Sequence, residues 1–194
     1  MNFLSHLYLS GDAEGLLIGN FIADSVKGSD FLNYPEAIQK GIVLHRKIDT
    51  FTDSHPIVEE SKQRLRERYK KYASVIVDVY YDHYLAVNWQ TYSSESLHDY
   101  AQKTYLLIDK NKHLLPYKSQ LFNEYMVQYN ILVAYAELEG IDRVFQGMSR
   151  RASFVSNMEH AIQELKEHYH LFGKEFDAFF PELQQFVNTQ IEIS

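Results

Sequence analysis

Proline and glycine are scarce in this sequence, and they fall mostly where stretches of helical pattern begin or end. The 194-residue chain has 4 prolines and 8 glycines. A proline is tolerated in the first turn of a helix, whereas the residue before a proline avoids helical geometry. No segment shows the alternation of apolar and polar residues that is typical of a strand. The pattern therefore predicts an all-α protein.

The same signals predict the helices and the linkers between them. In the first half of the chain we expect helices over residues 16–28, closed by Gly28, over 34–53, and over 56–89 with a bend near Ala73. A linker at 91–95 precedes a helix that ends at 113–116. The remaining helices are expected over 118–138, 140–152 and 156–187, and Pro181 is expected to interrupt the last one. No repeat, low-complexity tract or change of composition marks a boundary. We therefore expect residues 1–194 to form one single-domain helical bundle.

Composition limits the function classes. With 45% hydrophobic residues the chain can bury one core. It has no cysteine, so a bound metal would be held by imidazole and oxygen. A net charge of −7 argues against general binding of nucleic acid, which depends on basic surface. We expect a cytoplasmic protein without a membrane span, because neither a signal peptide nor an apolar run of about 20 residues is present.

Polar side chains enter the apolar faces of three expected helices. The first helix carries Asn20 and Asp24, the second His45, Asp49 and Asp53, and the third Asp78, Asp82 and His83. Residues three or four apart share a helix face. A buried anion needs a cation nearby, so carboxylates and imidazoles on three helices predict a metal site. Mixed oxygen and nitrogen ligands suit Mn²⁺, Mg²⁺ or Fe²⁺ as well as zinc.

Each of these residues also has a structural interpretation. A histidine such as His83 can be a hydrogen-bonded core residue, and Asp24 can cap a loop or pair with Lys27. Asp49 can form a surface pair with Arg46, which contributes only about 0.3 to 0.5 kcal/mol. The metal site is favoured because all the polar positions occur together.

A family resemblance is carried by five segments: MNFLSHLYLS, GNFIADSVKG, YPEAIQKGIVLHRKIDTFTD, DVYYDHYLAVNW and GMSRRAS. In order and spacing they resemble the acyl carrier protein phosphodiesterases, over nearly the whole chain. The resemblance implies an all-α, metal-dependent enzyme, most active with Mn²⁺, that is a divergent relative of the HD-type phosphohydrolases. Such enzymes hydrolyse the phosphodiester joining 4′-phosphopantetheine to a serine of holo acyl carrier protein.

Placed on this sequence, the resemblance implies a role for each site residue. The implied metal ligands are Asp24, His45, Asp82 and His83, with Asp78 as a supporting residue, and the implied catalytic residues are His6, Arg46 and Asp49. His6 would protonate the departing oxygen, Arg46 would contact phosphate, and Asp49 would act as base or orient His45. Asn20 is expected to contact the substrate, and the metal is expected to be Mn²⁺, with Mg²⁺ or Fe²⁺ as alternatives.

Four features bear on the match to the family pattern, and two of them, Tyr8 and His55, are departures from it. The order Asp82-His83 is the reverse of the HD signature. A literal His98-Asp99 pair lies in SSESLHDYAQK, which is typical of the solvated start of a helix, so we assign it no catalytic role. Tyr8 stands where relatives often carry a histidine, and the role of His55 is open.

Acyl carrier proteins are strongly acidic, so their enzyme needs local basic surface. The segment KQRLRERYKK and the later SRRAS supply it, and we expect the substrate to contact Arg64, Arg66, Arg68, Arg150 and Arg151. The alternative for the first cluster is a solvated helix face. Nucleic acid is a less favoured acidic partner.

The leading hypothesis is release of phosphopantetheine from holo acyl carrier protein. The alternatives are a metal phosphohydrolase acting on a nucleotide or another small phosphodiester, and a helical interaction protein without catalysis. The sequence leaves open the metal and its number, the carrier proteins accepted and the oligomeric state.

Overall fold

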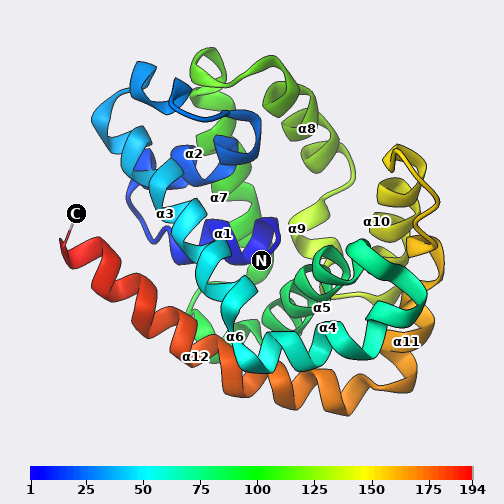
Figure 1. Cartoon of the computed structure of the whole chain (residues 1–194). Coiled ribbons are helices and arrows are strands. Elements are labelled where there is room, and N and C mark those ends of the chain that lie inside the picture. The colour runs from blue at the N-terminus through cyan, green and yellow to red at the C-terminus, as the bar shows by residue number, and fades with distance from the viewer. Residues whose placement is uncertain (194) are drawn as a thin grey trace.

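Every regular element in residues 1–193, the part described by the computed structural model, is a helix (Figure 1). The α-helices are α1 Phe3–Leu9, α2 Glu14–Ile22, α3 Glu36–Ser54, α4 Pro56–Tyr69, α5 Ala73–Val87, α6 Trp89–Tyr92, α7 Leu97–Lys110, α8 Tyr117–Gln128, α9 Ile131–Ala134, α10 Leu138–Arg151, α11 Ala161–Glu167 and α12 Tyr169–Ile193. Short 3₁₀ turns are η1 Ala23–Ser25, η2 Asp30–Asn33, η3 Lys70–Tyr72, η4 Lys112–Leu114 and η5 Met158–His160. The prediction of an all-α protein is confirmed. None of the described helices combines the length and apolar character that a membrane span requires.

Several predicted boundaries were wrong. The expected bend near Ala73 in the helix over 56–89 is a break between α4 and α5, because Lys70 has φ +51° and leaves helical geometry. Asn130, with φ +46°, likewise divides the expected helix over 118–138. The helix expected over 16–28 ends earlier, and Gly28 lies in the following turn with φ +50°. Left-handed backbone at an asparagine or lysine is set by tertiary packing, which local pattern does not report.

Pro181 was expected to interrupt the last helix, and it does not. α12 continues through it from Tyr169 to Ile193. A proline inside a helix costs about 3 kcal/mol. Burial on both sides of it offsets that cost, because Phe176, Phe180 and Leu183 are all fully buried.

The core is aromatic and is centred on α5. Tyr80 and Tyr81 of α5 are fully buried, and Tyr81 packs against Phe176 and Phe179 of α12 at ring-centroid distances of 5.8 and 5.5 Å. In Figure 1, α12 crosses the molecule beneath α4 and α5 and continues past α3. Within this core α5 packs against α1 and α12, and α12 also packs against α3.

Two glycines let α2 and α3 cross with their backbones in contact. A β-carbon added to Gly19 would lie 2.1 Å from the carbonyl oxygen of Ile38, and one added to Gly41 would lie 2.3 Å from that of Leu16. No side chain fits at either position. The crossing therefore brings Asn20, the residue after Gly19, beside His45 one turn after Gly41.

Candidate metal centre

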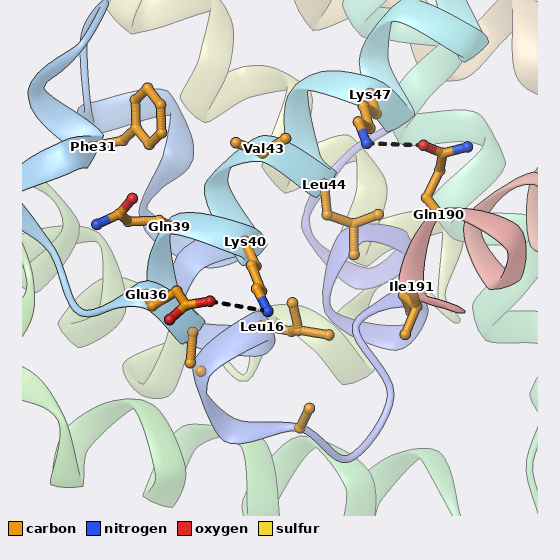
Figure 2. Close-up of a pocket in the computed structure, with 13 residues that line it drawn as sticks. Leu16, Phe31, Glu36, Gln39, Lys40, Val43, Leu44, Lys47, Gln190 and Ile191 are labelled. Carbon is orange, nitrogen blue, oxygen red and sulfur yellow. Dashed lines mark hydrogen bonds and ion pairs between the residues drawn. The ribbon is translucent and has the colours of Figure 1, made fainter. Parts of the chain in front are cut away.

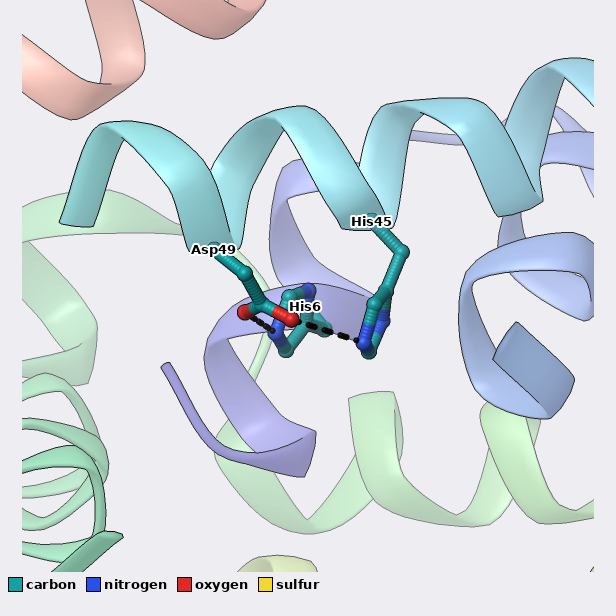
Figure 3. Close-up of side chains that lie close together, drawn as sticks. All are labelled: His6, His45 and Asp49. Atoms are coloured by element: carbon teal, nitrogen blue, oxygen red, sulfur yellow. Dashed lines mark hydrogen bonds and ion pairs between the residues drawn. The ribbon is translucent and has the colours of Figure 1, made fainter. Parts of the chain in front are cut away.

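Three side chains from two helices form a compact cluster. His6 comes from α1, and His45 and Asp49 lie one turn apart on α3; one ligand atom of each lies within 4.8 Å of the others (Figure 3). Asp49 joins the two histidines, with Oδ1 3.1 Å from Nε2 of His6 and Oδ2 3.1 Å from Nε2 of His45. The two imidazole rings stack with centroids 3.9 Å apart.

Asp24 adds a second carboxylate to the cluster. It lies in η1, directly after α2, and its Oδ1 is 3.3 Å from Nε2 of His45. Asp24, His45 and Asp49 line a cavity of about 200 Å³, whose other walls are Met1, Asn2, Asp53, Val75 and Asp78. Asp24 is exposed, whereas His6 and His45 are buried, so the cluster is open to solvent from one side.

Asn20 fixes which nitrogen of His45 carries hydrogen. Its amide nitrogen donates to the carbonyl oxygen of His6 at 2.8 Å and to Oγ of Ser10 at 2.9 Å, so its oxygen must face His45. Nδ1 of His45 lies 2.9 Å from that oxygen and therefore donates to it. In the neutral ring, Nε2 then carries the lone pair, and it faces the carboxylates of Asp24 and Asp49.

The lone pair of Nε2 is repelled by the two carboxylates that it faces. A cation between Nε2 and the carboxylates, either a proton or a metal ion, removes this repulsion. Two imidazoles and two carboxylates are the donor set that Mn²⁺, Fe²⁺ and Zn²⁺ accept. A hydrogen bond from the remote ring nitrogen to an amide oxygen is the arrangement that orients metal-binding histidines. The residues present therefore fit a divalent metal ion.

The proton affinities follow from the same contacts. Burial opposes a charge on His45, but hydrogen bonds to Asp24 and Asp49 outweigh it and raise its pKa to about 9. Burial, together with the nearby charge of His45, lowers the pKa of His6 to about 4. The pKa of Asp49 falls well below its usual range, because its contacts with both histidines outweigh burial. Without metal, His45 is thus charged and His6 neutral at pH 7.

Further carboxylates surround the cavity. Asp78 lies 3.1 Å from the amino group of Met1, and Asp53 accepts a hydrogen bond from Ser74 at 3.1 Å. Burial raises the pKa of Asp78, against the opposing effect of the amino group. The contacts of Met1 and Ser74 were not predicted, and no sequence pattern signals them.

Asp82, an expected metal ligand, faces the start of α1. Its Oδ2 accepts from the backbone nitrogen of Leu4 at 2.8 Å, and its Oδ1 accepts from the backbone and hydroxyl of Ser5. Burial, partly offset by these hydrogen bonds, raises its pKa to about 7. Asp82 is not among the residues that line the cavity. It satisfies free N–H groups of α1 and so holds the helix that carries His6.

His83, the second expected ligand on α5, has both ring nitrogens occupied. Nδ1 donates to the carbonyl oxygen of Tyr135 at 2.8 Å, and Nε2 lies 2.8 Å from the hydroxyl of Tyr169. Burial lowers its pKa. His83 is neither in the cluster nor among the residues that line the cavity, so the structure does not bring it to the site.

Arg46 supports the cluster indirectly. Its guanidinium donates to the carbonyl oxygens of Val26 and Gly28 at 3.1 and 3.0 Å and lies over the ring of Phe31. It therefore holds the turn that follows Asp24. Its donors are directed at backbone oxygens, and its expected contact with phosphate stays a prediction.

The basic residues divide into two groups. Arg64 pairs with Glu175 at 2.7 Å, Arg66 pairs with Glu59 at 2.7 Å, and Arg68 pairs with Glu164. Arg150 and Arg151 are exposed at the end of α10, and no ion pair to them is formed within residues 1–193. The other sequence candidates lie elsewhere: His98 and Asp99 are an exposed pair, and His55 contacts Glu182 at 3.2 Å.

A larger pocket lies between α2, α3 and the end of α12 (Figure 2). Its volume is about 440 Å³, and its wall is mostly apolar. Its lysines already have partners, since Lys40 pairs with Glu36 at 3.2 Å and Lys47 donates to Gln190 at 2.9 Å. None of the cluster residues lines it, so it is not part of the candidate metal centre.

Comparisons with known proteins point to one family. The family described as "Acyl carrier protein phosphodiesterase" matches residues 1–183. A protein of that name from Photorhabdus laumondii is 33% identical over 189 residues, which cover 95% of this chain and 94% of the relative. Another from Pectobacterium atrosepticum is 34% identical over 191 residues, covering 98% and 99% of the two chains. No solved structure gives a significant match.

Proposed function

This chain belongs to the acyl carrier protein phosphodiesterase family, and on that premise we propose that it releases 4′-phosphopantetheine from holo acyl carrier protein. The reaction breaks the phosphodiester to the carrier serine, adds water across it, and leaves apo carrier protein. The relatives that share this name match nearly the full length of the chain, which supports the same activity here.

The cluster around His45 is the proposed site of the reaction. The observation that carries it is the position of His45 Nε2, which Asn20 orients toward the carboxylates of Asp24 and Asp49. We place a divalent cation, most favourably Mn²⁺, with Mg²⁺ or Fe²⁺ as alternatives, among His6, Asp24, His45 and Asp49. Such an ion supplies neutralisation of the phosphoryl oxygens and a lowered pKa for water.

The chain's own residues have distinct tasks in this proposal. Asp49 touches both histidines and holds their rings stacked, so it serves as a ligand and an orienting group. His6 is neutral at pH 7, and neutral imidazole is the form that binds metals. We therefore propose that His6 is a metal ligand and not the group that protonates the departing oxygen. Asn20 and Arg46 position His45 and Asp24, and neither is directed at the substrate.

The proposal leaves two expectations without a test. The relationship to HD-type phosphohydrolases stays a prediction, as does location in the cytoplasm.

For Asp82 and His83, the two residues expected to carry the reversed signature, we propose structural roles, because backbone and side-chain groups of the protein already form hydrogen bonds with their polar atoms.

Purified protein incubated with holo acyl carrier protein and Mn²⁺ tests the function. We expect the carrier to lose the mass of phosphopantetheine, and we expect Asp24→Asn to lose the activity while keeping its helical circular dichroism. Asp99→Asn is the matched control, because Asp99 also faces a histidine and is exposed, but lies on α7. A carrier mass unchanged by the wild-type protein under all divalent metals would contradict the proposal.

A further inference from the structure

The arginines that look most basic in the sequence are already neutralised. Glu175 accepts two hydrogen bonds from Arg64, and Glu59 accepts two from Arg66. Glu164 accepts from Arg68 and from the hydroxyl of Tyr69. A carboxylate that is already paired in this way cancels the attraction that each arginine would exert on an acidic partner.

Four other cations have no carboxylate partner and lie on two neighbouring segments of the described chain. Lys70 and Lys71 form the turn between α4 and α5, and Arg150 and Arg151 end α10; all four side chains are exposed. Within residues 1–193 none of them forms an ion pair. Lys71 and Tyr72 of the turn contact Phe154, which follows the end of α10 by three residues.

Apolar side chains stand among these cations. Phe154 is 68% exposed and Val155 is 88% exposed, on the loop that follows α10. The ammonium of Lys71 lies 4.1 Å from the centre of the Phe154 ring, and the hydroxyl of Tyr72 donates to the carbonyl oxygen of Phe154. We call this surface the Phe154 patch; it consists of Lys70, Lys71, Arg150, Arg151, Phe154 and Val155.

The loop is held in place from beneath. Ser156 is buried, and its hydroxyl lies 3.1 Å from that of Ser149 on α10. Asn157 then turns the chain with φ +57°, and Met158 returns to the core. Because the residues on its inner side are fixed, the loop presents Phe154 and Val155 outward as a built feature.

The Phe154 patch borders the metal cavity by two routes. Val75, one turn after Lys71, lines the cavity, and Ser74 donates to Asp53 in its wall. Asn2 lines both the cavity and a small groove of about 70 Å³, and Arg151 also lines that groove. A macromolecule seated on the patch would therefore have a phosphodiester within reach of the cluster.

We propose that the Phe154 patch is the docking surface for the acidic carrier protein. This inference rests on the proposed function. Four uncompensated positive charges around two exposed apolar side chains complement a partner that presents carboxylates around an apolar centre. The chain's overall charge of −7 would repel such a partner elsewhere, so the patch also selects the face on which it lands.

The test measures binding and turnover in the same variants. The patch variant carries Lys71→Ser and Arg150→Ser, and the control carries Lys103→Ser and Lys110→Ser on α7, which remove the same charge. Fluorescence anisotropy with labelled holo carrier protein in EDTA gives Kd at low and high salt. We expect the patch variant to bind at least about tenfold more weakly at low salt, with a smaller salt dependence.

Phe154→Ser provides a second, charge-neutral variant and should also weaken binding of the carrier. Hydrolysis of bis(p-nitrophenyl) phosphate with Mn²⁺ should stay unchanged in every variant. If wild-type protein converts the carrier and the patch variant binds and converts it equally well, the docking inference is wrong and the proposed function stands. If wild-type protein does not convert it, the proposed function fails and the docking inference fails with it. Tighter binding of duplex DNA than of carrier protein at the patch would also overturn the inference.

Discussion

Binding of a divalent metal at the cluster should displace a proton from His45. In the metal-free protein the pKa of His45 is raised from 6.5 to about 9, so only about 1% of the molecules have a neutral ring at pH 7. A metal ion needs the neutral ring. We therefore expect the affinity for Mn²⁺ to rise about tenfold for each pH unit between 7 and 9, and one proton to be released per ion bound at pH 7.

The stability of the metal-free protein should change with pH in the opposite direction to its affinity for Mn²⁺. A raised pKa means that the folded protein binds the proton more tightly, so this stabilisation is complete below about pH 6.5 and is lost as the pH rises through about 9. The shift corresponds to at most about 3 kcal/mol in the free energy of unfolding. Metal-free protein should become less stable over this range, while the Mn²⁺-loaded protein gains affinity.

Isothermal titration with Mn²⁺ in buffers of different ionisation enthalpy counts the released protons. We expect about one proton at pH 7 and fewer near pH 9. His45→Gln should abolish the release, and His98→Gln should leave it intact. Binding of Mn²⁺ without proton release, at an affinity that is constant from pH 7 to 9, would refute the assignment of His45 as a ligand.

Three further predictions concern the packing and backbone geometry of the helices. Asp82→Ala should lower the free energy of unfolding by about 1 to 3 kcal/mol, because it strands the N–H groups of Leu4 and Ser5, while Mn²⁺ still binds by titration; loss of binding with unchanged urea unfolding would make Asp82 a ligand. Lys70→Gly should raise the free energy of unfolding by about 1 kcal/mol, because a φ of +51° suits glycine better than lysine. An unchanged or lower free energy of unfolding would show that the backbone at Lys70 is not strained. Gly41→Ala should cost at least about 2 kcal/mol, because its β-carbon meets the backbone of α2; urea unfolding at wild-type midpoint would show that the crossing can yield.

Local spacing predicted the part of the site that lies on one helix. His45 and Asp49 are four residues apart on α3, so their proximity is a property of the helix itself. The contact between α1 and α3 could not be predicted from helical spacing, because His6 is 43 positions from Asp49. Only the family resemblance suggested His6, and only the tertiary structure brings it to the cluster.

The expectation for α5 shows the limit of periodicity. A buried aspartate must find positive charge or hydrogen-bond donors, and helical spacing cannot tell which. For Asp82 the donors are the free backbone N–H groups at the start of α1, and backbone groups leave no trace in side-chain patterns. His83 similarly satisfies a backbone carbonyl, that of Tyr135, which lies 52 positions away.

The basic segments show the same difference between composition and structure. The sequence ranks the cluster at Arg64, Arg66 and Arg68 first because its charges are dense. Folding brings Glu175 and Glu164 to two of them from more than 90 positions away. The less conspicuous Arg150 and Arg151 are left uncompensated, so the charge available to a partner depends on the tertiary contacts.

The location of the metal tests the account most directly. Crystals of the protein soaked with Mn²⁺ and measured for anomalous scattering should show a peak among Nε2 of His45 and the carboxylates of Asp24 and Asp49, with His6 beside it, and this peak should be absent in Asp49→Asn. A peak at Asp82 and His83, or a protein that converts holo carrier protein with no peak at the cluster, would contradict it.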